Sequence, residues 1–523
     1  MANKTIKSSQ SLSHAAGRNV IWSVLDYGVV PLGMLVATPV LIHYLGIEQY
    51  GFLLLVTTFI GFSSIFNFGF GDTALKYVAH YNQLNDRSRV IEIIRTIGIL
   101  GLISGIAVGA LFFLSAPFMI ITFKLDSIPG ALNVLFVTSL IMPLKLMESI
   151  YVATLRGSHR YDLAAGVTVF VKVSNILFQV IAAIAGYSLP ILLLAVLITS
   201  MISNAILFTI IWMKLGNIFP GFSKSAFSEI KQFGMWSWTQ GLAGLIYSST
   251  DRLLISAIIG PAGLGIYGVC IQLAQNIHYG LSAAAHSLFP HISMLNSKHI
   301  NTLPADGKSL RDIYLQVTRL LTITAVLMGS LMAVFSYEIL EIWVGQEIAT
   351  KGHLVLALLS LSFSWFASNS IVTYYTLNGL GRAKLQAGVS VTSAIIMAAT
   401  SILFIPIYGL MGAAAVRLPD SIFRMGIKIF ITRRIIGNIS AWVSFDFLRI
   451  TIVMLVSGYF FRNFLVLISA DQNILKDPVN LFLLVVFSIV MYIITNNVEI
   501  WVSKSRPFMP SEYIENMGKN NDK

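Results

Sequence analysis

The sequence LGIEQYG at residues 45–51 recurs in shortened form, GLGIYG, at residues 263–268. A second match follows each copy, because LRGSHR at residues 155–160 shares its Leu, Gly and final Arg with LNGLGR at residues 377–382. The Tyr-Gly pairs lie 217 residues apart, and the second pair of segments lies 222 residues apart. Two matches at nearly the same offset indicate that much of the chain is one unit present twice.

The composition is typical of a membrane protein. Of 523 residues, 56% are apolar and 11% are charged, and the mean hydropathy is +0.78. Soluble globular chains carry about 25% charged residues, so these values exclude a soluble enzyme and a disordered chain. Cys270 is the one cysteine in the sequence, which excludes an intrachain disulfide and a multi-cysteine metal site.

Hydrophobic runs of about 20 residues, separated by short polar segments, predict transmembrane helices. Fourteen such runs occur, at 20–45, 50–72, 96–121, 130–154, 163–186, 190–213, 233–259, 263–289, 320–344, 353–377, 386–407, 410–431, 448–469 and 479–502. The first run is too long for a cleavable signal sequence, so we expect it to remain as a helix. The predicted fold class is therefore all-α, a polytopic membrane protein with about 14 helices.

The connecting segments are basic on one side of the predicted membrane. Counted with the adjoining ends of the spans, one alternating set of segments holds 26 lysines and arginines and the other set holds four, and five more lie deeper within spans. Basic loops are cytoplasmic in membrane proteins, so we expect both chain termini in the cytoplasm. The net charge of +12 then reflects topology, which argues against nucleic-acid binding.

The repeat and the spans together predict two six-helix bundles. Because six is an even number, both bundles have the same orientation, as in parallel repeats that bind substrate between them and rock to give alternating access. The predicted organisation is a cytoplasmic N-terminal segment at 1–19, a first bundle at 20–213, a cytoplasmic linker at 214–232, a second bundle at 233–431, two additional helices at 432–502 and a cytoplasmic tail at 503–523.

Charged side chains in the predicted spans of the first bundle are candidates for function. Each costs about 2.5–3.5 kcal/mol at bilayer depth and must face protein or water. Lys145 and Glu148 are three residues apart and can pair, which leaves a structural role and a role in transport open. The fifth span has one polar stripe, which either lines the transport path or joins neighbouring helices: Thr168, Lys172, Asn175 and Gln179.

The first span of each bundle contains a carboxylate. Asp26 shares its span with two prolines that permit bending, and it is either an ion site or the partner of a neighbouring helix. Asp251 precedes Arg252, and adjacent helical residues point about 100° apart, so the two should have different partners. The twelfth span holds charges that either pair or, for the last two, extend to the cytoplasmic surface: Arg417, Asp420, Arg424 and Lys428.

Hydrogen-bonding side chains follow one face of the eighth span: Gln272, Gln275, Tyr279, Ser282 and His286. Amides and an aromatic ring suit a sugar, and core packing with satisfied polar groups is the alternative. The sequence has no metal-ligand spacing, no catalytic constellation and no phosphate-binding loop, so no metal and no cofactor are expected.

Four segments carry a resemblance to a known family. They are the Leu-Gly-x-x-x-Tyr-Gly turn, NFGFG at 67–71, DRLLI at 251–255 with the Gly-x-x-x-x-Gly-x-Tyr that follows, and the pattern PxYGxxGAA at 406–414. Over about residues 15–435 the chain resembles the polysaccharide transporter, or O-antigen flippase (Wzx), branch of the MATE-like (MOP) exporter superfamily. The resemblance implies a bacterial inner-membrane protein that moves a polyprenyl-pyrophosphate-linked oligosaccharide from the cytoplasmic to the periplasmic leaflet. Its expected functional partners are glycosyltransferases and a polysaccharide polymerase.

The resemblance implies roles for the polar residues of the spans. A pyrophosphate needs fixed cations, and the candidates are Lys145, Lys172, Arg252, Arg417 and Arg424. The sugar-contact candidates are Gln272, Gln275 and Tyr279. An exporter without an ATP site draws on an ion gradient or on consumption of its product, and the candidates for ion coupling are Asp26, Asp251 and Glu148. Asp26 has no basic neighbour in its helix, so we expect it to carry the proton and Asp251 to be a fixed partner.

Other functions remain open at this point. A cation-coupled multidrug antiporter of the same superfamily should have an acidic, aromatic cavity, whereas the charges within these spans have a small positive excess. A peptidoglycan-precursor flippase would share the cationic cavity and the fourteen helices. A membrane-embedded glycan ligase or polymerase usually needs large periplasmic loops with catalytic residues, and the predicted loops are short, so we expect no enzyme.

Overall fold

The computed structural model describes residues 2–285, 310–379 and 382–431, with positions 433, 451–456, 458, 459 and 463. Only the backbone is described for residues 2–28 and for a few positions elsewhere. Helices and connecting turns account for these residues, and no strand occurs among them. The chain divides into two compact units, residues 1–444 and 445–523, and the helices named below belong to the first unit.

Broken and short helices form the first half of this unit. Its elements are α1 (Ala2–Phe62), η1 (Ser63–Asn67), α2 (Phe70–Gln83), α3 (Arg87–Leu114), α4 (Ala116–Thr122), α5 (Ala131–Gly157), α6 (Tyr161–Ile184) and α7 (Leu189–Leu215). α1 is interrupted at Gly46, whose φ of 79° is a conformation that glycine adopts without a steric penalty. This break separates the first two predicted spans, which the sequence joins by the repeated turn.

Broken and short helices also form the second half of this unit. Its elements are α8 (Lys224–Ile258), α9 (Pro261–Ala285), α11 (Leu310–Val334), α12 (Ser336–Val344), α13 (Gln346–Gly379), α14 (Ala383–Ala415) and α15 (Arg417–Ile431). α14 is interrupted at Gly409, with a φ of 58°, between the eleventh and twelfth predicted spans. α8 begins inside the predicted linker, nine residues before the predicted span, because the Ser223 side chain accepts a hydrogen bond from the Ala226 amide and caps the helix.

The all-α membrane class predicted from the sequence is confirmed. Eight segments of the described chain are long and apolar enough to cross a membrane, and two of them, Val29–Asn67 and Lys384–Ala415, contain the glycine breaks. α8, α9 and α15 are not among the eight. The count of fourteen spans stays a prediction, since most of the thirteenth span and all of the fourteenth lie outside the described residues.

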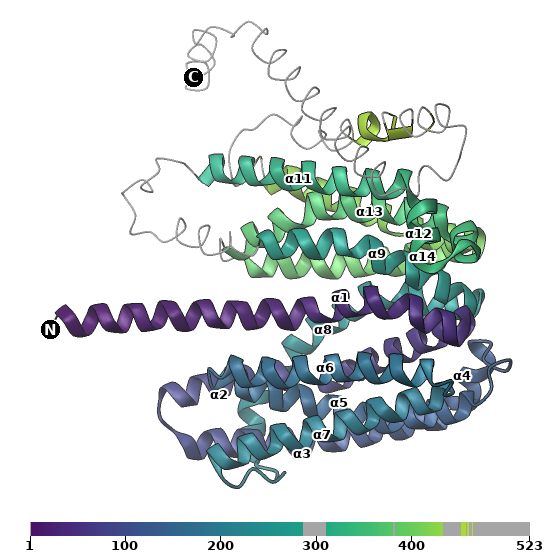
Figure 1. Cartoon of the computed structure of the whole chain (residues 1–523). Coiled ribbons are helices and arrows are strands. Elements are labelled where there is room, and N and C mark those ends of the chain that lie inside the picture. The colour runs from purple at the N-terminus through teal and green to yellow at the C-terminus, as the bar shows by residue number, and fades with distance from the viewer. Residues whose placement is uncertain are drawn as a thin grey trace, which may run out of the picture. The chain divides into compact units, whose positions relative to one another are not determined.

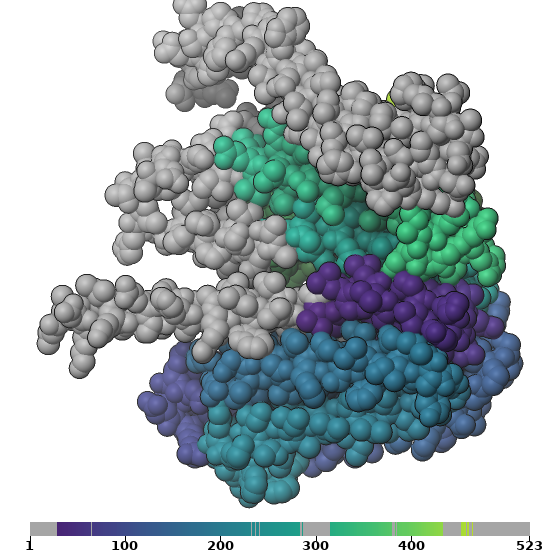
Figure 2. Space-filling view, in the orientation of Figure 1, coloured from purple at the N-terminus to yellow at the C-terminus, as the bar shows by residue number. Residues whose placement is uncertain are grey.

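α1 lies between the two halves. It packs against α6 of the first half and against α9 of the second, and Figure 1 shows it in this position. Gly33 of α1 allows a close approach to the Ile176 side chain of α6. In the space-filling view, the coloured part of α1 lies directly against the first-half helices (Figure 2).

The apolar core is shared by the halves at one end of the bundle and divided at the other. The shared core contains residues of both halves, among them Leu41, Leu135, Ile255 and Leu356. Near the other end, a second core belongs to α2, α3, α5, α6 and α7 with the first turns of α8, and a third core belongs to α9, α11 and α13. The halves are therefore joined by apolar packing chiefly at the end where the repeated turns lie.

The two copies of the repeated turn touch through their backbones. A Cβ atom at Gly51 would lie 1.8 Å from the carbonyl oxygen of Pro261, and one at Gly265 would lie 2.4 Å from that of Ile47. Side chains are excluded at both positions unless the backbone moves. The glycines that define the repeat in the sequence thus form a contact between the halves.

We expect Gly51→Ala to destabilise the protein, because the added methyl group must displace the backbone of Pro261. Overpacking of this kind costs about 1–3 kcal/mol or more. The control is Gly166→Ala in α6, where a Cβ meets open space and alanine favours the helix by about 1 kcal/mol. Thermal unfolding of the two purified variants in detergent tests this, and an equal midpoint for both would contradict the contact.

Candidate functional site

Asp251 of α8 is the centre of a buried ion pair in the second half. Its carboxylate is fully buried, and Arg417 Nη2 of α15 lies 3.2 Å from Oδ2. Tyr267 of α9 donates a hydrogen bond to the same oxygen at 2.6 Å, and the backbone amide of Arg252 donates to Oδ1 at 2.9 Å. A buried carboxylate is stable only with such partners. The charge partner of Asp251 is thus Arg417, while Arg252 contacts it through the backbone amide; a separate partner for the Arg252 side chain stays a prediction.

A second buried pair lies one turn further along α15. Asp420 Oδ2 accepts hydrogen bonds from Arg424 Nε and from the Tyr247 hydroxyl of α8, each at 2.9 Å. The i, i+4 spacing predicted this pair, whereas Arg417 pairs with α8 and not within its own helix. One nitrogen and one oxygen, Arg417 Nε and Asp420 Oδ1, are buried without a hydrogen-bond partner among the described residues.

Aromatic rings enclose both arginines. The Arg417 guanidinium lies 4.7 Å from the ring centre of Phe363, and that of Arg424 lies 4.8 Å from Phe366. Tyr247 stacks on Phe366 at 6.0 Å. Such contacts stabilise a desolvated cation by about 2 kcal/mol. Neither phenylalanine can be identified from the sequence, because two apolar residues in an apolar helix carry no distinguishing signal.

Lys428 does not extend to the surface. Its side chain is 2% exposed, and Nζ donates a hydrogen bond to the Ser368 carbonyl oxygen at 3.1 Å. The alternative that the last charges of the twelfth span reach the cytoplasmic surface is wrong for this residue and for Arg424, whose side chain is 12% exposed. The Ser368 carbonyl group of α13 provides Lys428 with a partner that α15 alone does not contain, whereas the carboxylate that pairs with Arg424 belongs to α15 itself.

In the first half, Lys145 and Glu148 of α5 form the ion pair that their spacing predicts. The Nζ and Oε2 atoms are 2.8 Å apart, and the side chains are 26% and 13% exposed. This pair is more open than the two pairs of the second half. Its charges therefore carry a smaller desolvation penalty.

The polar stripe of α6 faces away from the apolar surface of that helix. Thr168 is buried, Lys172 and Gln179 are half-buried, and Asn175 accepts a hydrogen bond from Thr199 of α7. Large apolar residues on other faces are exposed, namely Phe170, Leu177, Phe178 and Ile181. The expectation that the stripe faces the bundle agrees with these exposures.

The polar face of α9 divides into different environments. Gln272 is buried against α1, where its side-chain oxygen accepts hydrogen bonds from Thr38 and Tyr50. Gln275 is half-buried and Tyr279 is 50% exposed. His286 lies outside the described residues, and Asp26 lies in α1 where only the backbone is described. The sugar and ion roles of these residues stay predictions.

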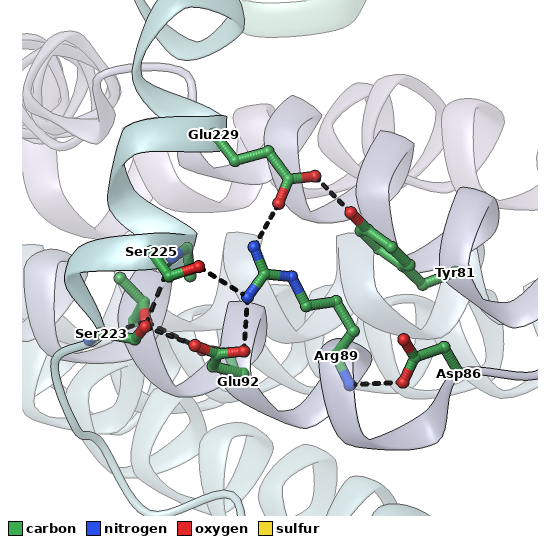
Figure 3. Close-up of polar contacts among 9 residues, drawn as sticks. Tyr81, Asp86, Arg89, Glu92, Ser223, Ser225 and Glu229 are labelled. Carbon is green, nitrogen blue, oxygen red and sulfur yellow. Dashed lines mark hydrogen bonds and ion pairs between the residues drawn. The ribbon is translucent and has the colours of Figure 1, made fainter.

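A polar cluster that the sequence analysis missed holds the start of α8 against α2 and α3 (Figure 3). Arg89 donates hydrogen bonds to Glu92 and Glu229, both at 2.6 Å, and Ser223 donates to Glu92. Tyr81 also donates to Glu229, which raises the pKa of the Tyr81 hydroxyl because ionisation would bring two negative charges together. The second half thus begins on the surface of the first.

The sequence is similar to proteins of polysaccharide biosynthesis and O-antigen transport. Residues 40–350 match the family model described as polysaccharide biosynthesis protein. A Shigella flexneri protein proposed to be an O-antigen transporter is 22% identical over 422 residues, which is 76% of this chain and 93% of that protein.

Solved structures of transporters have the same fold. The lipid II flippase MurJ in an inward closed conformation has a TM-score of 0.68 at 14% identity, over 92% of this chain and 98% of that one. A multidrug resistance MATE family transporter of the MOP superfamily has a TM-score of 0.60 at 12% identity, over 78% and 97%. A MOP superfamily transporter from Pyrococcus furiosus has a TM-score of 0.55 at 13% identity, over 80% and 93%. With a family model that matches more than half of its length, the chain belongs to the polysaccharide biosynthesis protein family, and it has the fold of MOP superfamily transporters.

Proposed function

We propose that this protein moves a polyprenyl-pyrophosphate-linked oligosaccharide from the cytoplasmic to the periplasmic leaflet of a bacterial inner membrane by alternating access. The family match and the O-antigen relative support a flippase-type transporter of surface polysaccharide. The observation that carries the alternating-access proposal is the division of the apolar core. Its functional partners would be the glycosyltransferases that build the glycan and the polymerase that consumes it.

The divided core supports a rocking motion. At one end the halves share packing around Tyr50 and Tyr267, while at the other end the first half packs around Ile97 and the second around Ile277. The first turns of α8 pack in the core of the first half and stay with it. Two bodies joined at one end can separate at the other without unpacking either core. A substrate with a sugar head could then enter between the halves from the end with divided cores.

The charge pattern supports an orientation for this motion. The loops next to the divided cores are the basic ones, including Arg87, Arg89 and Arg160, which the positive-inside rule assigns to the cytoplasm. The shared core then lies at the periplasmic side, and both termini are cytoplasmic. The lipid-linked glycan is made on the cytoplasmic side, so an entrance there fits the proposed substrate.

The ion pairs suggest different roles for the candidate cations. Arg417 and Arg424 are each held by an aspartate, so we assign them a structural role in the second half and a contribution to its positive potential. Lys145 and Lys172 are less buried, and with Arg252 they are the preferred pyrophosphate ligands. The partners of Asp251 support the fixed role expected for it, and Asp26 remains the proposed proton carrier.

Transport in proteoliposomes tests this function. We expect the purified protein to move a fluorescent polyprenyl-pyrophosphate oligosaccharide between leaflets, and to move lipid II or a cationic dye at least tenfold more slowly. Protein-free liposomes and liposomes that contain an unrelated membrane protein are the controls. Faster movement of lipid II would make the protein a peptidoglycan-precursor flippase, and faster movement of the dye would make it an antiporter.

Lys172 should matter through its charge. A charge-assisted hydrogen bond contributes about 1.5–3 kcal/mol, so Lys172→Ala should weaken the apparent affinity for the lipid-linked glycan about 10- to 100-fold, and Lys172→Arg should weaken it less. Lys351→Ala is the matched control, because Lys351 lies in an exposed pair with Glu347. Concentration-dependent flipping measures this effect, and equal curves for Lys172→Ala and the control would remove Lys172 from the site.

Asp251 and Arg417 should be strongly coupled. Either Asp251→Asn or Arg417→Gln leaves one buried group without its charge partner, which costs about 3–5 kcal/mol, and the double variant should be milder than the sum. The exposed Glu347–Lys351 pair should show coupling of about 0.5 kcal/mol or less in the same double-mutant cycle. Unfolding of the four proteins in detergent measures the coupling, and additive losses would show that the buried pair does not act as a unit.

A further inference from the structure

A buried hydrogen-bonded trio joins the halves beside the repeated turns. Thr38 Oγ1 and Tyr50 Oη of α1 both donate to Gln272 Oε1 of α9, at 3.0 Å and 3.3 Å, and the two hydroxyl oxygens are 3.2 Å apart. Thr38 and Tyr50 are fully buried, and Gln272 is 8% exposed. These three residues, which we name the inter-half clasp, link positions 234 residues apart in the sequence.

The clasp lies where the backbones of the halves meet. Tyr50 precedes Gly51, whose Cα faces the Pro261 carbonyl. A further bond between the halves lies close by, where Trp343 Nε1 of α12 donates to the Leu35 carbonyl oxygen of α1 at 2.8 Å. The stretch of α1 from Leu35 to Gly51 is thus held to the second half by polar bonds and close packing together.

Not all hydrogen-bonding atoms of the inter-half clasp have a partner. Gln272 Nε2 is buried and has no hydrogen-bond partner among the described residues. A buried amide without an acceptor opposes the closed arrangement, whereas separation of the halves would give water to all three side chains. The hydrogen bonds therefore fix the relative position of the two halves in the closed state. The unpaired amide limits the stability of that state, which suits a contact that has to open.

The tyrosine at the equivalent position of the second copy makes a different hydrogen bond. Tyr267 matches Tyr50 in the repeat, but its hydroxyl donates to Asp251 within its own half. Both tyrosines are fully buried. The same turn thus anchors an interior carboxylate in one copy and bonds the opposite half in the other, so the clasp is not a consequence of the repeat alone.

We propose that the inter-half clasp is the latch that keeps this end of the bundle closed, and that it opens to release substrate on this side. The proposal rests on the alternating-access function proposed above. Gln272 is then a positioning residue that acts through Thr38 and Tyr50, in place of the sugar contact expected from its position on the polar face of α9.

Cysteine labelling of the detergent-purified protein tests the latch. The reporter is Leu54→Cys in a Cys270→Ala background, because the Leu54 side chain faces Gly268 of the other half. Loss of one hydrogen bond should raise the rate of maleimide labelling about two- to tenfold in Thr38→Val or Tyr50→Phe, and further in the double variant. Thr138→Val is the control, because its buried hydroxyl bonds only the Val134 carbonyl of its own helix.

A cross-link provides the second measurement. A Cβ at Gly268 would lie 2.0 Å from Leu54 Cδ1, so cysteines at both positions are close enough to be joined. We expect the oxidised pair to stop movement of the lipid-linked glycan in proteoliposomes and the reduced pair to restore it. Equal labelling of the double variant and the control, or full transport by the cross-linked protein, would overturn the latch. Faster labelling in a protein that moves no lipid-linked glycan would support the latch and overturn the proposed function.

Discussion

The backbone contact between the two copies of the repeated turn is the constraint on which the rest of the bundle depends. Gly51 against Pro261 and Gly265 against Ile47 allow the two halves to approach more closely than any side chain permits. This approach brings Tyr50 to the second half and lets one apolar core extend through both. The close approach of the turns also determines at which end of the bundle the halves share a core. At the opposite end the halves have separate cores.

The two halves differ in how their interior charged side chains are paired. The second half neutralises its deepest charges in two buried pairs, Asp251 with Arg417 and Asp420 with Arg424, both enclosed by aromatic rings. The first half keeps a more open pair and a half-buried lysine on α6. Arg417 and Arg424 are therefore neutralised within the second half, which also keeps the half-buried Arg252, whereas the charged pair of the first half is more exposed.

Sequence reasoning succeeded where a structural feature is local or repeats along one helix. Helical periodicity alone predicts the i, i+3 pair of Lys145 with Glu148, the i, i+4 pair of Asp420 with Arg424 and a stripe around Lys172 that faces the bundle. The apolar runs likewise predicted most of the helices, because about 20 apolar residues suffice to define a membrane-spanning element.

Contacts between distant segments could not be predicted in the same way. Arg417 and Asp251 are 166 residues apart, and nothing in either helix specifies the other as its partner. Lys428 is buried because α13 offers a carbonyl group, and a single helix viewed alone does not contain that acceptor. Gln272 has the pattern of a sugar ligand in its own helix, and only the position of α1 reveals its bonds to Thr38 and Tyr50.

The central claim is that the two halves move against each other, with one end opening as the other closes. Pulsed electron paramagnetic resonance on the Cys270→Ala protein measures this directly with two pairs of spin labels at exposed positions. One pair, Tyr187 and Thr350, spans the halves at the shared core, and the other, Leu84 and Arg382, spans them at the divided cores. On addition of lipid-linked glycan we expect a longer distance in the first pair together with a shorter distance in the second. Unchanged distances in both pairs, in a preparation that transports the glycan, would contradict the account.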